Sequence, residues 1–173
     1  MIKIIILFST FISLTAGAQT VKWYTFEQAI KLNQTEPRKI LIDVYTDWCG
    51  WCKVMDKNTF SNPIVAAYLT KMYYPVKLNA EQRDSILYKG TTFRYVAQGA
   101  RGYHELAAAL LSGEMSYPAI VFMSEQEQVI YVQRGYMEAQ PFDEIINFIG
   151  GDFFKTEAWE TWRAAYKSPF ITN

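Results

Sequence analysis

The two cysteines of the chain, Cys49 and Cys52, directly follow an apolar run at residues 40–45. A buried strand that leads into a helix is typical of this pattern, so we expect the pair at a strand-to-helix junction. The first turn of a helix has unpaired N–H groups and the positive end of the helix dipole, and both favour a thiolate. We therefore predict that Cys49 is the nucleophile. Cys52, one turn further on, is predicted to attack the mixed disulfide that Cys49 forms with a substrate.

Two other uses of a cysteine pair fit this chain less well. A structural zinc site takes four ligands, and the chain offers two cysteines and one histidine, His104. We expect His104 to be a solvated or capping residue at the start of a helix. A structural disulfide across two intervening residues removes little entropy from the unfolded chain. We therefore favour redox chemistry by the dithiol, with no metal and no bound cofactor.

Size and charge exclude several classes of partner. The chain has 173 residues, half of them apolar, which suffices for one domain with a sizeable core. Seventeen basic residues balance seventeen acidic ones, so neither nucleic acid nor an anionic membrane surface is an expected partner. We expect proteins or small thiols instead.

Residues 1–18 have the pattern of a secretory signal peptide. Lys3 precedes an apolar stretch at residues 4–14, and small residues follow up to Ala18. A membrane anchor or a buried strand is the alternative, but the stretch is short for a bilayer span. We expect cleavage near Ala18, a single mature domain at residues 19–173 without a membrane span, and a periplasmic or secreted location.

Hydrophobic periodicity and capping residues predict the order of the core elements. The expected helices lie at residues 25–32, directly after Cys49, at 63–72 and at 141–150, and the expected strands at 40–45, 74–78, 119–123 and 129–133. The last two strands are close enough in sequence to form a hairpin. Asp43 would then be a charge in a strand that is buried on both faces.

A long connection at about residues 82–116 does not belong to this core pattern. It is predicted to contain two short strands around Lys89-Gly90 and an alanine-rich helix at residues 103–111. Connections of this length are usually functional or bind a partner. We expect the segment to be a partner-facing insertion.

The tail at about residues 152–173 is a second addition. Trp159, Trp162 and Tyr166 have helical spacing, and Thr156 is a candidate N-cap. We expect this aromatic helix to dock on its own domain.

Four features in order along the chain resemble the thioredoxin superfamily. They are the strand and dithiol helix at residues 40–53 with Asp43 six residues before Cys49, the strand at 76–79 with Lys77, Pro118 before an apolar strand, and Gly135 after the last strand. The similarity covers about residues 39–149. Residues 52–63 look closest to the periplasmic C-terminal domain of Dsb-type transmembrane thiol reductases.

The resemblance implies an α/β thioredoxin fold. This fold has a central mixed β-sheet with helices on both faces. The long connection becomes an insertion between the third strand and the cis-proline strand, and the tail becomes an extra C-terminal helix.

The resemblance also implies a substrate-binding surface around the dithiol. It implies a cis bond before Pro118, against the general rarity of such bonds, and a backbone that faces Cys49 and pairs with an extended substrate. Trp48 and Trp51 are heavily buried residue types in general, but beside an exposed thiol we expect them to form an apolar collar. The predicted substrate-binding residues are Trp48, Gly50, Trp51, Tyr117 and Gly135.

Asp43 and Lys77 are predicted to lie together beneath the dithiol helix. Burial should raise the pKa of Asp43, while the Lys77 ammonium should lower it. A purely structural ion pair is the alternative. We expect Asp43 to accept the proton of Cys52, directly or through one water.

These inferences predict an exported thiol:disulfide oxidoreductase that reduces protein disulfides, with a membrane thiol reductase as its electron donor. Thioredoxin has proline at the position of Trp51, and residues between the cysteines tune the reduction potential. The direction of electron flow therefore stays open. A net oxidant or isomerase is one alternative, and a partner-binding module with an incidental dithiol is another.

Overall fold

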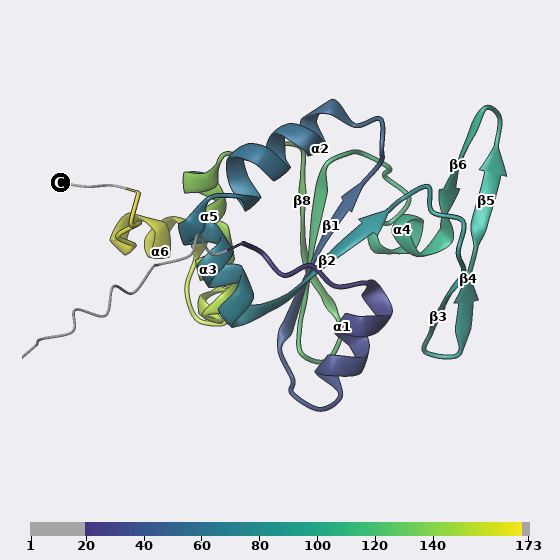
Figure 1. The fold of residues 1–173 in the computed structure, drawn as a ribbon. Coiled ribbons are helices and arrows are strands. Elements are labelled where there is room, and N and C mark those ends of the chain that lie inside the picture. Colours follow the sequence, from purple (N-terminus) through teal and green to yellow (C-terminus); the bar gives the residue numbers. More distant parts are fainter. Residues whose placement is uncertain (1–19, 171–173) are drawn as a thin grey trace, which may run out of the picture.

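A four-stranded mixed sheet forms the centre of the protein, and the computed structural model describes residues 20–170 (Figure 1). The predicted signal peptide and the last three residues of the tail lie outside the described residues. The strands are β1 (Lys39–Tyr45), β2 (Tyr73–Asn79), β7 (Ala119–Met123) and β8 (Val129–Arg134), in the order β2-β1-β7-β8. β1 is parallel to β2 and antiparallel to β7, and β8 is antiparallel to β7. The sheet is therefore mixed, as predicted.

Helices cover both faces of the sheet because the side chains of β1 alternate between two apolar cores. Ile40, Ile42 and Val44 face the core that holds α1 (Phe26–Asn33) and α4 (Glu105–Leu110). Leu41 faces the second core, which holds α2 (Gly50–Met55), α3 (Pro63–Met72) and α5 (Ala139–Gly150). Figure 1 shows α3 and α5 on one side of the sheet and α4 on the other. Asp43 shares the face of Leu41 and therefore lies on the side of the dithiol helix.

Local signals explain where the helices begin. Thr25 and Gln28 form the predicted capping box of α1, and Asn62 caps α3 with Pro63 in its first turn. α5 begins at Ala139, two residues before the predicted start. Within residues 20–170 no helix is long and apolar enough to cross a bilayer.

The dithiol helix α2 continues into a π-helical turn, η1 (Asp56–Phe60), which the sequence analysis did not predict. Such turns occur as single insertions in α-helices and are frequent at functional sites. Here the turn carries Asp56.

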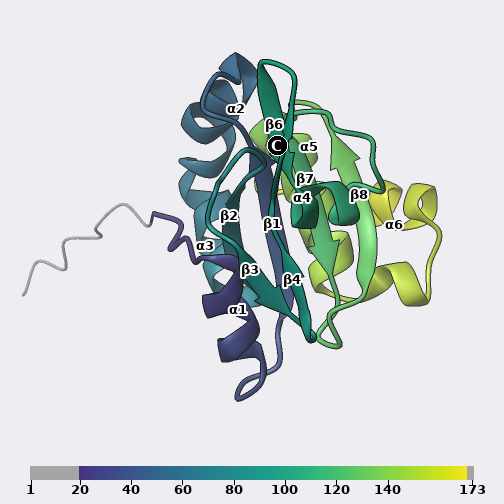
Figure 2. The ribbon, with the colours of Figure 1, turned by 90° about the vertical axis from the view of Figure 1, so that its right-hand side faces the viewer.

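The insertion leaves the sheet at the end of β2 and faces the viewer in Figure 2. The insertion was predicted to follow the third strand. β2 is the third extended segment of the chain if Tyr24, which forms a single parallel bridge to Val76, is counted as the first. β3 (Ile86–Tyr88) and β4 (Thr91–Phe93) pair around Lys89 and Gly90, which both have positive φ, so the predicted hairpin is confirmed.

A second hairpin in the insertion corrects the expected helix at residues 103–111. β5 (Tyr95–Gln98) pairs with β6 (Arg101–His104), and α4 begins only at Glu105. The alternation in β6 is too short to indicate a strand by itself, and the pairing with β5 decides its conformation.

His104 was expected to be either a solvated residue or a capping residue. It is the N-cap of α4, and it is not solvated. Its side chain is fully buried, and Nδ1 accepts the backbone N–H of Leu106 at 3.3 Å. Nε2 lies 3.1 Å from the carbonyl oxygen of Asp84. Burial lowers the pKa of His104, so it serves as a neutral structural residue.

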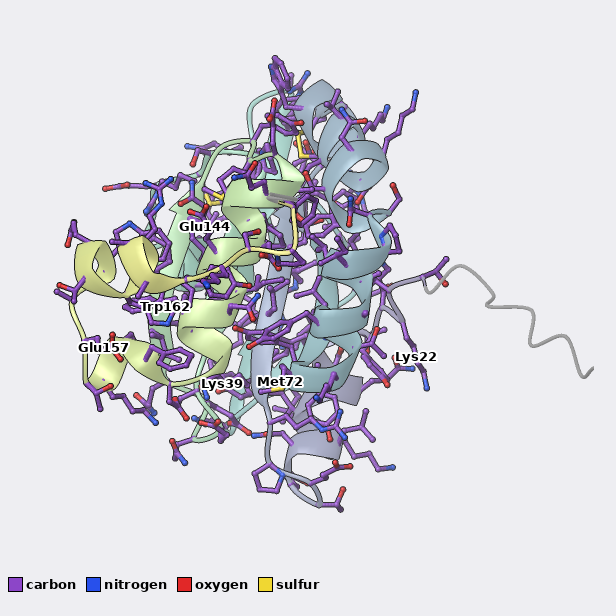
Figure 3. The ribbon with its side chains drawn as sticks, turned by 90° about the vertical axis from the view of Figure 1, so that its left-hand side faces the viewer. Lys22, Lys39, Met72, Glu144, Glu157 and Trp162 are labelled. Atoms are coloured by element: carbon purple, nitrogen blue, oxygen red, sulfur yellow. A yellow bond between two sulfur atoms is a disulfide. The ribbon has the colours of Figure 1, made fainter. Side chains whose placement is uncertain are left out.

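The C-terminal helix α6 (Trp159–Ala165) docks on its own domain, as predicted (Figure 3). Trp162 is buried, and its ring lies 5.1 Å from Phe148 of α5 and 4.5 Å from Tyr166. Thr156 is not the N-cap of this helix, because α6 begins after Ala158 and has no side-chain cap.

Candidate active site

Cys49 and Cys52 form a disulfide at the junction of β1 and α2, with an S–S distance of 2.05 Å. Cys49 is the N-cap of α2, and its sulfur accepts the backbone N–H of Cys52 at 3.1 Å. The Cys49 N–H in turn donates to the carbonyl of Thr46. The strand-to-helix placement is therefore as predicted. Among residues 20–170, no three His, Cys, Asp or Glu side chains are grouped to hold a metal ion.

The two cysteines are less exposed than expected, whereas the flanking tryptophans are exposed, as a collar requires. Cys49 is 5% exposed and Cys52 3%, whereas Trp48 is 50% exposed and Trp51 61%. The expectation of an exposed thiol is therefore wrong for this disulfide form, in which both cysteines are buried. The two indole rings, and not the cysteine side chains, are therefore the exposed groups at this junction.

Trp48 is held by groups from three parts of the chain. Its ring lies edge-on to Tyr117 at a centroid distance of 6.0 Å, and its Nε1–H donates to Glu81 at 3.0 Å. The Arg101 guanidinium carbon lies 4.2 Å from the centroid of the Trp48 ring. The structure thus brings the predicted residues Trp48 and Tyr117 together. Sequence reasoning missed Glu81 and Arg101, because only the tertiary fold brings the turn after β2 and the second hairpin of the insertion next to Trp48.

Trp51 contacts a residue that was also missed. Its ring lies 5.3 Å from that of Tyr136, which directly follows Gly135. The position of Tyr136 next to a predicted site residue could have identified it. Gly50, between the cysteines, is exposed, and a Cβ there would meet nothing within 4 Å. No packing contact with residues 20–170 therefore requires glycine at position 50.

Pro118 and Gly135 lie side by side at the start of β7 and the end of β8. The Tyr117-Pro118 bond is cis, so that prediction is confirmed. The Gly135 N–H donates to the carbonyl of Pro118 at 2.8 Å. Gly135 has φ of +82°, a conformation that favours glycine.

Asp43 and Lys77 form the predicted ion pair. Asp43 is 1% exposed, and its Oδ2 accepts from Lys77 Nζ at 2.5 Å. Burial raises the pKa of Asp43 from 3.8 to about 6, against the lowering effect of Lys77. Asp43 can therefore bind or release a proton near neutral pH.

A second carboxylate, Asp56 of the π-helical turn, also pairs with Lys77. Burial opposes the charge of Lys77, but Asp43 and Asp56 outweigh it and raise the pKa of the ammonium. The charge of Asp56 adds to the rise in the pKa of Asp43. Sequence reasoning missed Asp56, because the π-helical turn that aims it at Lys77 has no clear sequence signal.

One oxygen of Asp43 is left without a partner. Asp43 Oδ1 and Thr46 Oγ1 are buried and make no hydrogen bond to any residue in the range 20–170. Buried polar atoms are nearly always paired, so an orphaned oxygen calls for an explanation. Asp43 belongs to β1, and Thr46 directly follows this strand, three residues before Cys49.

Comparisons with known proteins agree with this geometry. The chain is 30% identical over 125 residues to the thiol:disulfide interchange protein DsbD of Vibrio vulnificus, and 27% identical over 128 residues to that of Photorhabdus laumondii. These alignments cover 71% and 73% of this chain but only 18% and 19% of the two relatives. The chain therefore spans less than a fifth of the length of these curated relatives.

Two solved structures share the fold. A DsbH oxidoreductase superposes with a TM-score of 0.57 at 12% identity, over 90% of this chain and 96% of the other. A thioredoxin from Thermus thermophilus superposes with a TM-score of 0.58 at 16% identity, over 78% and 93%. The fold of residues 20–170 is thus a thioredoxin fold with two inserted hairpins and an added C-terminal helix.

The match to a family model is the most extensive of these similarities. The model is Thioredox_DsbH, described as a protein of unknown function, DUF255, and it matches residues 8–165 of the 173. The match includes the CXXC pair, both hairpins of the insertion and the whole of the C-terminal helix α6. The chain belongs to the thioredoxin-like DsbH/DUF255 family.

Proposed function

We propose that the protein is an exported thiol:disulfide oxidoreductase that reduces disulfides in other proteins. The observation that carries this proposal is the CXXC disulfide at the N-terminus of a helix in a thioredoxin fold, with the Cys49 sulfur accepting a backbone N–H of that helix. The same N–H favours a thiolate on Cys49 once the disulfide is reduced. Exchange of thiols with another protein follows from this arrangement.

The reaction runs in two displacements. The Cys49 thiolate attacks one sulfur of a client disulfide, the client S–S bond breaks, and the departing client sulfur takes up a proton. Cys52 then loses its proton and attacks the Cys49 sulfur of the mixed disulfide. The Cys49–Cys52 disulfide forms, and the client leaves as a dithiol with two more electrons than before. A reduced dithiol protein must then return two electrons to the pair.

Asp43 is the proposed acceptor for the proton of Cys52. Its buried Oδ1 has no partner among residues 20–170, and its pKa of about 6 allows it to be ionised at neutral pH. Lys77 holds the other oxygen. The second displacement therefore has a base available where water is largely excluded.

The proposed location rests on the signal-peptide pattern of residues 1–18, and the proposed direction of flow rests on the likeness to DsbD. Its name assigns it thiol:disulfide interchange, and this chain aligns with only part of it. We extend from this likeness a membrane thiol reductase as the electron donor, and from the signal-peptide pattern a periplasmic or secreted location. Trp51 stands where thioredoxin has proline, and this position tunes the potential, so a net oxidant or isomerase is the alternative.

Trapping of mixed disulfides tests the proposal. We expect Cys52→Ser, mixed with an oxidised test protein such as insulin, to accumulate a covalent complex that reductant dissolves. Cys49→Ser is the matched control and should accumulate very little. Equal trapping by both variants would refute the assigned roles, and no trapping by either would leave the partner-binding module as the better description.

The reduction potential of the pair decides the direction. A value near that of thioredoxin, about −270 mV, supports a reductase, whereas a value near about −120 mV supports an oxidant. Equilibration of the wild-type chain with glutathione buffers gives this value.

A further inference from the structure

The hairpin β5–β6 of the insertion extends to the end of the molecule that carries the dithiol. In Figure 1 the turn of this hairpin and the start of α2 point to the same end. Arg101 lies beside that turn, paired with Gln98, and its guanidinium packs on the ring of Trp48. The insertion therefore contributes a side chain next to the residue that precedes Cys49.

The hairpin is held firmly at its base. The His104 N–H donates to the carbonyl of Ala80 at 2.6 Å, and the Glu105 N–H donates to that of Arg94 at 2.9 Å. Glu105 Oε2 accepts the N–H of Arg94 at 2.7 Å. These bonds tie the hairpin to the end of β2 and to α4, so Arg101 is presented by an ordered element.

The side chain of Tyr95 crosses the hairpin at a glycine. A Cβ on Gly102 would collide with the Tyr95 ring and with the Val96 carbonyl, so only glycine fits there. The Arg83 guanidinium in turn stacks on the Tyr95 ring at 4.7 Å. The close packing of Tyr95 against Gly102 thus helps to hold the β5–β6 hairpin, which carries Arg101, in one conformation.

Arg101 has unused hydrogen-bonding capacity. Its guanidinium makes no ion pair or side-chain hydrogen bond within residues 20–170, and its contact with Trp48 uses one face of the group. A guanidinium has five N–H donors in its plane, arranged as a fork that matches a carboxylate. Glu81, the acidic residue nearby, accepts from the Trp48 indole and forms no ion pair with Arg101.

We propose that Arg101 is a specificity-determining residue that binds a carboxylate of the client next to its disulfide. This inference rests on the proposed function and names the class of client, a protein or peptide cystine flanked by an aspartate or glutamate. Trp48, held by Glu81, Tyr117 and Arg101, provides the apolar surface on which the client chain lies. The alternative is that Arg101 only packs against Trp48 and recognises nothing.

Two matched peptides test the proposal. Each is closed by one disulfide and has blocked termini, and the two differ only in an Asp or an Asn beside one cysteine. The fully reduced chain is mixed with each peptide, and tryptophan fluorescence gives the rate of exchange. Each rate is divided by the rate of the same peptide with dithiothreitol, because a negative charge slows attack by any thiolate.

We expect the wild-type chain to favour the Asp peptide by roughly two- to five-fold at low salt, the scale of an exposed ion pair. High salt should reduce the preference, since exposed charges are screened. Arg101→Gln should bring the ratio to about one, and Arg101→Glu should reverse it. Arg94→Gln is the matched control: it removes an exposed positive charge from the same insertion without touching Trp48, and should keep the wild-type ratio.

The outcomes separate this inference from the proposed function. A wild-type chain that reduces both peptides at equal corrected rates, or an Arg101→Gln chain that keeps the preference, would overturn the role of Arg101 and leave the oxidoreductase intact. A wild-type chain that reduces neither peptide would overturn the proposed function. In that case, the role of Arg101 is tested by titrating each peptide into the disulfide form of the protein. Tighter binding of the Asp peptide by wild type, lost in Arg101→Gln, supports the role. Equal binding of the two peptides by wild type refutes the role.

Discussion

The protein buries two aspartates to the same extent but surrounds them differently. Asp43 on β1 and Asp143 on α5 are each 1% exposed. Asp143 accepts hydrogen bonds from Asn147 at 3.0 Å, from Tyr166 at 3.0 Å and from Ser168 at 2.9 Å. Among residues 20–170, Asp43 accepts a hydrogen bond only from the Lys77 ammonium, at Oδ2, and its Oδ1 has no partner.

The difference separates a structural carboxylate from one that is suited to chemistry. Burial raises the pKa of both groups, but the donors around Asp143 oppose the rise, and two of them belong to the C-terminal segment. Asp143 thus fastens that segment to α5, with both oxygens in use. Asp43 keeps one oxygen without a partner among residues 20–170, on the face of the sheet that carries the dithiol helix, where the proposed mechanism needs an acceptor for the proton of Cys52.

The largest expected effect comes from Asp43→Asn. An amide cannot accept the proton of Cys52, so we expect the second displacement to slow by about 100-fold, the lower end of general base catalysis. The first displacement by Cys49 needs no base and should change little. Rapid-quench measurements should show mixed disulfide accumulating in the variant, with a flatter pH dependence of its decay.

Asp143→Asn is the matched control for that experiment. It makes the same chemical change at an equally buried aspartate on α5, and it should leave the decay of the mixed disulfide at the wild-type rate. If Asp43→Asn also decays at the wild-type rate and alters only stability, Asp43 is a structural residue and the contrast between the two aspartates disappears.

A smaller effect is expected from Asp143→Ala. The substitution leaves the hydroxyls of Tyr166 and Ser168 without their acceptor, and unpaired buried groups cost about 2–3 kcal/mol in the free energy of unfolding. Ser168→Ala, which removes one bond of the set, should cost about 1 kcal/mol. Urea denaturation measures both, and amide exchange should rise first in α6. Unchanged stability in Asp143→Ala would show that the tail docks through its aromatic residues alone.

The sequence predicted the parts of the fold that depend on local pattern. Three of these patterns each span only a few residues: the apolar run of β1, the capping box of Thr25 and Gln28, and the Asn62-Pro63 start of α3. The cis bond before Pro118 came from the resemblance to thioredoxins, and no composition or spacing indicated it. These elements suffice to place the dithiol.

Contacts between distant segments were not predictable in the same way. The strand β6 exists because it pairs with β5, and the Trp48 side chain meets Glu81 across 33 residues of chain. The π-helical turn that brings Asp56 to Lys77 is likewise decided by packing. The residues missed in the site are therefore those whose position depends on tertiary structure.

The last prediction concerns the pH dependence of stability, measured on the disulfide form so that the cysteines do not titrate. Asp43 has a pKa of about 6 in the folded protein against 3.8 in the unfolded chain. Between these values the folded protein binds more protons, so ionisation of Asp43 lowers the free energy of unfolding as the pH rises from 4 to 6. The raised pKa of Lys77 acts only near pH 10 and above, and does not contribute to this slope.

Other groups titrate in the same range, since burial also shifts Asp143 and His104. The difference between wild type and Asp43→Asn removes their contributions. We expect wild type to lose about 1–3 kcal/mol relative to the variant between pH 4 and pH 7, because one pKa unit corresponds to about 1.4 kcal/mol. Parallel curves would mean that Asp43 is already ionised at pH 4 in the folded protein. Lys77 would then hold the carboxylate charged throughout, and Asp43 would have too low a pKa to be an efficient base for Cys52.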